Sequence, residues 1–275
     1  MNLFSGNILD IQSKIFYISI CCFLFLMIFI LSMIFDTSRK EEQEELLVFA
    51  AVSLTGPINE IIEKFEKDTG VNVNISFGAS QSLAQQIVSG APASIFLSAG
   101  IFPIEFLKKH YLHIIETINL VNNRLVLALP ADNNFIPKSL QDLDNSKIHR
   151  IAIANPKLAP AGQYSKEALE SQGIWEILEP KIVFAADVRT TLAYIESGNV
   201  DIGIVYSTDV LSSDLIMPVD IIPAHSHSPI VYPMVVIKHT DYDTNILKLI
   251  DYLKNPDSQI IFEKYGFINN RSTPD

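Results

Sequence analysis

Four short stretches of the sequence combine serine, glycine and alanine in a way that suits the binding of an anion. They are residues 51–55 (AVSLT), 78–82 (GASQS), 159–162 (APAG) and 186–189 (ADVR). Small side chains let an anion approach the backbone closely, and serine hydroxyls and backbone N–H groups are hydrogen-bond donors. Each stretch lies where a strand pattern gives way to a helix pattern. Its N–H groups would then lie at the positive end of a helix dipole, without helical partners.

The elements around these stretches alternate between strand and helix patterns. Residues 46–51 are a short apolar run, and apolar side chains then recur at helical spacing until Gly70. Residues 71–77 alternate strictly, which is typical of a half-buried strand. Further runs of strand length are residues 94–98, 125–129, 151–154, 200–206 and 231–237. Repeated βα units predict an α/β fold with parallel-rich sheets covered by helices, in which ligands bind at the carboxyl ends of strands.

Each stretch taken alone also has a plainer explanation. Serine and aspartate are favoured helix N-caps, and Asp187 fits that role before a helix beginning at Val188. The spacing therefore predicts an anion-binding α/β protein, but it does not name the anion.

The composition fits a globular protein of two lobes and argues against several partners. The chain has 275 residues, of which 48% are hydrophobic. Its 31 acidic and 20 basic residues give a formal net charge of −11. No lysine and arginine cluster is present, so we expect no nucleic-acid partner. The two cysteines, Cys21 and Cys22, lie near the N-terminus, so the rest of the chain has neither a disulfide nor a Cys-ligated zinc site.

The N-terminal segment is predicted to be a membrane anchor. Residues 15–35 carry no charge and are long enough to cross a bilayer core as a helix. Residues 1–14 would be cytoplasmic, and the glutamate-rich residues 36–45 would be a linker. Two alternatives are a cleaved signal peptide, which usually has a shorter apolar region and small residues at its cleavage site, and a lipoprotein. A lipidated cysteine would stand near the end of the apolar run, whereas Cys21 and Cys22 lie near its start.

Several longer motifs follow one another along the chain and carry a family resemblance. They are VFAAVSLT (48–55), SLAQQI (82–87), PAGQYSKEAL (160–169), DVR (187–189), GIVYSTD (203–209) and FEKYGF (262–267). With these motifs the chain resembles the periplasmic molybdate-binding proteins, the solute receptors of molybdate ABC importers. The resemblance implies a non-enzymatic, monomeric receptor without a cofactor. It would bind molybdate or tungstate on the periplasmic or extracytoplasmic face of the membrane and deliver it to an ABC transporter permease.

The resemblance also implies a two-lobed periplasmic-binding-protein fold with the ligand cleft between the lobes. We expect the chain to cross between lobes near residues 120–125 and 230–233. Lobe I would then comprise residues 46–121 and 231–275, and lobe II residues 122–230.

In the family the oxyanion is held by two serine hydroxyls with nearby N–H groups, two further backbone N–H groups and a tyrosine hydroxyl. The matching positions here are Ser53, Ser80, Ala161, Val188 and Tyr206. The first four lie in the stretches described above. Tyr206 comes from the resemblance alone, because a tyrosine at the end of a strand is usually a core or rim residue.

The chain departs from the family at residues 94–100. This segment reads SIFLSAG, where the family typically has aspartate at both ends. Ser94 and Gly100 therefore replace two acidic residues near the cleft. They do not match ligand-contact positions, so we expect binding to survive, with altered hydrogen bonding nearby.

The chemistry of molybdate fits a site made only of donors. Molybdate is a tetrahedral dianion whose oxygens only accept hydrogen bonds, and several bonds to a charged partner can offset its dehydration without an ion pair. Hydrogen phosphate carries a proton that such a site leaves unpaired. Sulfate would be rejected only because it is smaller than molybdate. Tungstate would not be rejected, because it matches molybdate in both charge and size.

Other functions remain open from sequence alone. A receptor for another tetrahedral oxyanion such as sulfate, or an oxyanion sensor without transport, would have a similar sequence. An enzyme is disfavoured because no G-x-S-x-G, P-loop or G-x-G-x-x-G motif is present. His225 with His227, and His110 with His113, could each be part of a metal site, but no third ligand is evident.

Overall fold

The computed structural model describes residues 19–20, 23–30, 46–110, 114–133, 135–237 and 244–269. The chain divides into two compact units, Met1–Glu45 and Leu46–Asp275. In the first unit residues 19–20 and 23–30 are helical. Of the helices described, none has both the length and the apolar character needed to cross a membrane. The structure describes residues 19–20 and 23–30 of the predicted anchor, and the predicted cytoplasmic segment and linker lie entirely outside the described residues.

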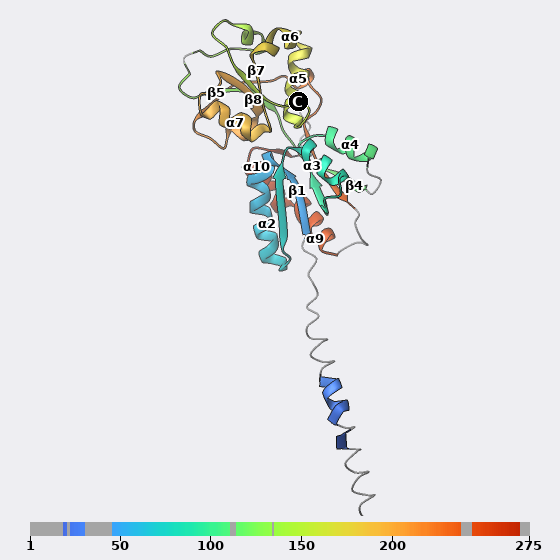
Figure 1. The fold of residues 1–275 in the computed structure, drawn as a ribbon. Coiled ribbons are helices and arrows are strands. Elements are labelled where there is room, and N and C mark those ends of the chain that lie inside the picture. The colour runs from blue at the N-terminus through green and yellow to red at the C-terminus, as the bar shows by residue number, and fades with distance from the viewer. Residues whose placement is uncertain are drawn as a thin grey trace, which may run out of the picture. The chain divides into compact units, whose positions relative to one another are not determined.

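The first of two sheets in the Leu46–Asp275 unit has six strands (Figure 1). Near one edge of this sheet, β1 pairs in parallel with β2 and β3. On the far side of β3, β10 pairs antiparallel with both β3 and β4, and β11 pairs antiparallel with β4. The strands in order across the sheet are β11 (Ile268–Asn269), β4 (Ile114–Asn122), β10 (Val231–Ile237), β3 (Ile95–Leu97), β1 (Leu46–Ala51) and β2 (Val73–Gly78).

The second sheet has five strands. Here β6 pairs in parallel with β7 and β8, while β5 pairs antiparallel with β8 and β9. The strands in order are β7 (Ile182–Ala185), β6 (Ile151–Ala154), β8 (Ile202–Tyr206), β5 (Leu125–Pro130) and β9 (Ile216–Ile221).

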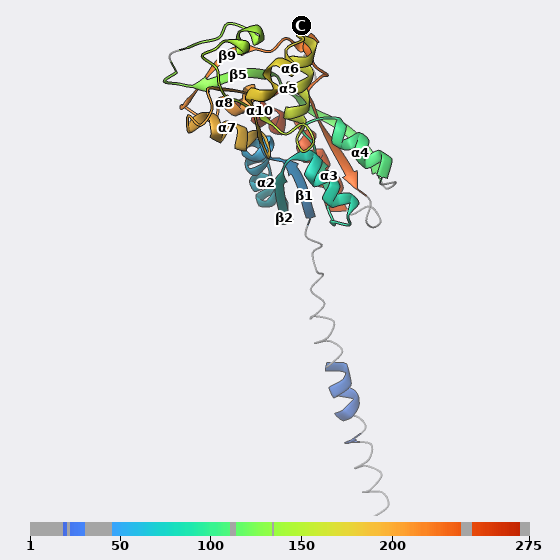
Figure 2. The same cartoon turned by 45° about the horizontal axis from the view of Figure 1, so that its top comes forward.

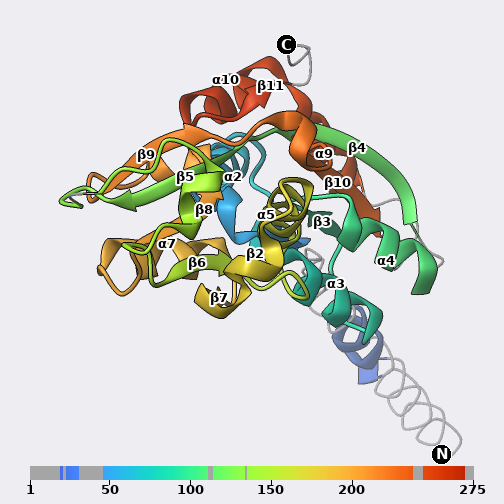
Figure 3. The same cartoon turned by 90° about the horizontal axis from the view of Figure 1, so that it is seen from above.

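Both sheets are mixed, so the prediction of parallel-rich sheets was wrong. The antiparallel pairs come from β4, β5, β9 and β10, the strands on either side of the two passages between the sheets. Figure 3 shows the long strands β4 and β10 running side by side. A strand that enters or leaves a sheet by such a passage needs no helical crossover, so it is free to pair antiparallel with its neighbour.

Helices cover both faces of the first sheet, which explains why β1 is apolar at every position. Val48 and Ala50 pack in one cluster of buried residues together with α2, α9 and α10, whereas Phe49 packs in another with α3 and α4. Figure 2 shows α2 and α3 on either side of β1. Gly70 caps the C-terminal end of helix α2, and its φ of 70° lies in the left-handed region. These helices are α2 (Thr55–Thr69), α3 (Ser80–Val88), α4 (Phe102–His110), α9 (Thr244–Lys254) and α10 (Pro256–Lys264).

Helices also pack against the second sheet. Helices α5 and α7 pack against β6 and β8, with α6 beside α5 and α8 beside α7. These helices are α5 (Pro160–Ser171), α6 (Trp175–Leu178), α7 (Val188–Glu196) and α8 (Ser207–Val210). The 3₁₀ turns are η1 (Val52–Leu54), η2 (Leu140–Asp144), η3 (Glu179–Lys181) and η4 (Ala224–Ser226).

The chain passes between the two sheets twice. It leaves the first sheet at Asn122 and enters the second at Leu125, and it returns between Ile221 and Val231. The pairing of the strands does not show to which lobe the connecting residues belong. The lobe boundaries drawn from the sequence therefore stay a prediction.

Candidate ligand-binding site

A small pocket is lined by residues that follow the carboxyl ends of strands in both sheets. Its empty volume, which includes space open to solvent, is about 220 Å³. All five residues predicted to bind a ligand line it, and no lysine or arginine side chain does. The lining residues are Ala51, Val52, Ser53, Gly78, Ala79, Ser80, Ala99, Ala159, Pro160, Ala161, Asp187, Val188 and Tyr206.

The first sheet contributes two serines that are almost fully buried. Ser53 follows β1 in η1, and its Oγ lies 3.1 Å from the hydroxyl oxygen of Tyr232. Ser80 is the first residue of α3, and its Oγ accepts a hydrogen bond from the Ala99 N–H at 3.0 Å. Because the Ser80 oxygen already accepts from a backbone nitrogen, its own proton is free to be donated elsewhere.

The second sheet contributes two backbone positions. Ala161 is the second residue of α5, after Pro160, and Val188 is the first residue of α7. Asp187 caps α7 by accepting from the Thr190 N–H at 2.7 Å, so its predicted role as an N-cap is confirmed. The carboxylate therefore stabilises the helix start.

Four of the five predicted residues occupy the first or second position of a helix. They are Ser53 in η1, Ser80 in α3, Ala161 in α5 and Val188 in α7. Backbone N–H groups at these positions have no acceptor within their own helix. The pocket therefore gathers donors from four helix starts without any cationic side chain.

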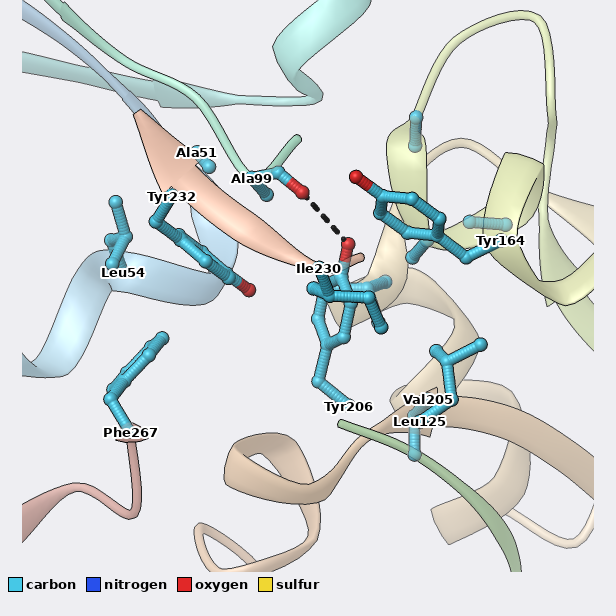
Figure 4. Packing of buried hydrophobic residues seen from close by; sticks show 14 of the residues in the cluster. Ala51, Leu54, Ala99, Leu125, Tyr164, Val205, Tyr206, Ile230, Tyr232 and Phe267 are labelled. Carbon is cyan, nitrogen blue, oxygen red and sulfur yellow. Dashed lines mark hydrogen bonds between the residues drawn. The ribbon is translucent and has the colours of Figure 1, made fainter. Parts of the chain in front are cut away.

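Tyr206 ends β8 and reaches across to the first sheet. Its ring is 1% exposed, and its hydroxyl donates to the Ala99 carbonyl oxygen at 3.2 Å (Figure 4). Burial raises the pKa of Tyr206 well above its ordinary value, with a smaller contribution from the neighbouring Tyr232. The phenol therefore stays protonated at neutral pH and remains a donor.

Gly100 has a steric role that its departure from the family pattern did not suggest. A Cβ atom at this position would lie 2.6 Å from the Tyr164 hydroxyl and 2.8 Å from Pro160 Cβ. The absence of a side chain thus lets the start of α5 approach the segment that follows β3. The structure gives no further account of the serine at position 94.

Sequence reasoning missed the residues behind the pocket. Tyr232 is 1% exposed and contacts Ser53, and Asn123 donates to the Tyr232 hydroxyl at 3.2 Å. Both lie at passages between the sheets, a position that could have suggested them. Ala99, which contacts both Ser80 and Tyr206, carries no signal in its residue type because it acts through its backbone.

Among the described residues, which include His110, His225 and His227, no group of three potential metal ligands occurs. His110 Nδ1 lies 2.9 Å from the Phe106 carbonyl oxygen, and His227 Nδ1 lies 2.8 Å from that of Ser228. His113 lies outside the described residues.

Asp209 is a fully buried carboxylate beneath Tyr206. One oxygen accepts from the Tyr206 N–H at 3.1 Å, and the other lies 3.5 Å from Arg189 Nε. Burial raises the pKa of Asp209 from 3.8 to about 6, although Arg189 opposes the shift. The folded protein therefore holds this proton more tightly than the unfolded chain does.

We expect this carboxyl to make folding less favourable as pH rises from about 4 to about 6. Because the pKa of Asp209 is higher in the folded protein than in the unfolded chain, its contribution to stability is fully present below about pH 4. That contribution, on the order of 3 kcal/mol, is lost as the pH rises through about 6. Asp209→Asn should flatten that part of the pH profile, measured by urea unfolding at a series of pH values. Asp132→Asn, at an exposed turn, is the matched control and should leave the profile unchanged. An equal slope in the wild type and Asp209→Asn would contradict the assignment.

Residues 46–268 match the family described as bacterial extracellular solute-binding protein. The chain belongs to this family. The molybdate-binding protein ModA of Escherichia coli (strain K12) is 36% identical to this solute-binding protein over 231 residues, which cover 82% of this chain and 90% of that one.

Two solved structures are similar to the solute-binding protein. The periplasmic molybdate-binding protein of Azotobacter vinelandii has a TM-score of 0.73 at 26% identity, with 84% of this chain and 100% of that one covered. The sulfate-binding protein SubI of Mycobacterium tuberculosis H37Rv has a TM-score of 0.71 at 15% identity, with 82% and 87% covered, and shows the fold alone. These likenesses confirm the predicted α/β binding-protein fold, with the mixed sheets described above.

Proposed function

We propose that this solute-binding protein captures molybdate or tungstate outside the cytoplasm and delivers it to the permease of an ABC importer. The observation that carries the proposal is that Ser53, Ser80, Ala161, Val188 and Tyr206 line one pocket. The similarity to molybdate-binding proteins over most of the chain supports the same ligand.

The pocket suits a dianion although the chain has a net charge of −11. Each hydrogen bond from a buried N–H or O–H to a charged oxygen is worth about 1.5–3 kcal/mol. Four helix starts and three hydroxyls supply several such bonds, and the helix dipoles add a positive potential. The capture of the oxyanion therefore needs no lysine or arginine.

Ligand contacts from both sheets would favour closure of the protein around the oxyanion. Ser53 and Ser80 belong to the first sheet's side of the pocket, whereas Ala161, Val188 and Tyr206 belong to the second's. For Tyr206 to donate to the oxyanion, its single proton must turn away from the Ala99 carbonyl oxygen. A ligand that contacts both sides shifts the population toward the closed form, which the permease would recognise.

Isothermal titration tests the proposal directly. The fragment 46–275, a compact unit by itself, is titrated with molybdate, tungstate, sulfate and phosphate. We expect tight binding of molybdate and tungstate, weak binding of sulfate, and the weakest binding of phosphate, whose proton would face only donors. Tight binding of sulfate alone would favour a sulfate receptor. A folded fragment that binds none of the four would refute an oxyanion receptor.

We also propose that residues 15–35 anchor the receptor on the extracytoplasmic face of the membrane. Their 21 uncharged positions and the family's extracellular location support this placement. Fractionation of cells with an antibody to the fragment 46–275 tests it. The anchored chain stays in the membrane pellet after a carbonate wash, whereas a chain cleaved after the apolar run is released as a soluble protein.

A further inference from the structure

Asn123 lies in the two-residue passage from β4 to β5, and its amide orientation is fixed by its neighbours. Its Oδ1 lies 2.8 Å from the Arg124 backbone nitrogen and 3.1 Å from Ser207 Oγ. A backbone nitrogen only donates, so the atom facing it must be the amide oxygen. The amide nitrogen therefore points the other way, to Thr208 Oγ1 at 2.9 Å and the Tyr232 hydroxyl at 3.2 Å.

The direction of the next hydrogen bond follows from that orientation. An amide nitrogen has protons but no lone pair to offer, so the Tyr232 oxygen accepts from Asn123. Burial raises the pKa of Tyr232, so it keeps its proton. Of the hydroxyls near Tyr232, that of Tyr206 gives its own proton to the Ala99 carbonyl oxygen, whereas Ser53 Oγ lies within hydrogen-bond distance of Tyr232, at 3.1 Å. Tyr232 therefore donates to Ser53.

Ser53 is thus left with its own proton to donate. Its oxygen accepts from Tyr232 and its side chain lines the pocket. Ser80 also keeps its proton free to donate, because its oxygen accepts a hydrogen bond from the Ala99 N–H. Both serines are held with a proton available for an oxyanion.

We propose that Asn123 and Tyr232 are positioning residues that fix the Ser53 hydroxyl as a donor and so make the pocket reject oxyanions that carry a proton. The inference rests on the proposed function, since it concerns discrimination among oxyanions at the same site. Neither residue lines the pocket, so both act on the ligand through Ser53. The chain of bonds runs from Asn123, between the two sheets, to Tyr232 at the second passage and ends at Ser53.

Two substitutions change this chain in different ways. Tyr232→Phe removes the donor to Ser53 and leaves the serine free to donate or to accept. Asn123→Asp replaces the amide donor with an acceptor, so Tyr232 would turn its proton to the new carboxylate. Ser53 would then donate to Tyr232 and present lone pairs to the pocket. The second change should therefore disturb oxyanion binding more than the first.

The test is titration of each variant with molybdate and with inorganic phosphate at neutral pH. We expect molybdate affinity to fall about 3- to 10-fold in Tyr232→Phe and more than about 10-fold in Asn123→Asp. Phosphate affinity should be maintained or rise, so the ratio of molybdate to phosphate affinity falls from wild type through Tyr232→Phe to Asn123→Asp. Tyr252→Phe is the matched control, because it removes a hydroxyl bonded to Asp68 on α2, outside the pocket, and should leave both affinities unchanged.

The outcomes separate the inference from the proposed function. Thermal unfolding first shows whether each variant is folded. If Asn123→Asp does not fold, the affinities of Tyr232→Phe alone test the inference. An unchanged affinity ratio in the folded variants, or an equal loss for both ligands, would overturn the role of Asn123 and Tyr232. Absence of molybdate binding by the wild type would instead overturn the proposed function.

Discussion

Replacing Val188 by proline is expected to weaken molybdate binding by about 10- to 150-fold while the protein stays folded. Val188 is the first residue of α7, a position at which proline is well tolerated because its missing N–H has no helical partner. Asp187 before it has φ −155° and ψ 179°, an extended conformation of the kind that a following proline requires. The substitution therefore removes one donor from the pocket with little effect on the helix.

Val188→Ala is the control for this experiment. It shortens the same buried side chain but keeps the backbone N–H, so its molybdate affinity should stay close to that of the wild type. Titration calorimetry gives both affinities, and circular dichroism with thermal unfolding shows whether α7 is intact. Similar affinities for Val188→Pro and the wild type would show that this N–H does not bind the ligand.

Gly162→Ala is expected to destabilise the protein by about 3 kcal/mol, at the upper end of the usual cost of overpacking. A Cβ atom on Gly162 would lie 1.9 Å from the Ala154 carbonyl oxygen and 2.6 Å from its carbonyl carbon. These are backbone atoms at the end of β6, so α5 would have to move away from the strand. Ala161, next in the chain, would move with it, and molybdate binding should weaken as well.

Gly78→Ala serves as the matched substitution at a strand end of the first sheet. There the nearest atom to an added Cβ is a side-chain carbon of Leu83 at 3.2 Å, which can shift. We expect a smaller loss of stability than for Gly162→Ala, measured as the free energy of unfolding in urea. Equal losses in the two variants would show that the contact of α5 with β6 does not govern the effect.

The local parts of the fold could be predicted from the sequence. The strand Leu46–Ala51, the helix ending at Gly70 and the strand Val231–Ile237 are all present where apolar patterning indicated them. The strand β4 (Ile114–Asn122) was missed, because its charged and polar residues obscure the alternation. Helix α5 begins at Pro160, within the stretch 159–162 that was expected to lie at a helix start. Its first turn is made of small residues that carry no helical periodicity.

The sequence by itself determined that Ser53, Ser80, Ala161 and Val188 lie at helix starts, since the unpaired N–H groups there depend on near neighbours in the chain. The resemblance added Tyr206. Only the tertiary structure decided that all five line one pocket and which residues hydrogen-bond to them. Tyr206 meets Ala99 across 107 residues of chain, and Ser53 meets Tyr232 across 179. Such contacts depend on how two mixed sheets pack together, and the spacing of residues along the chain does not encode that packing.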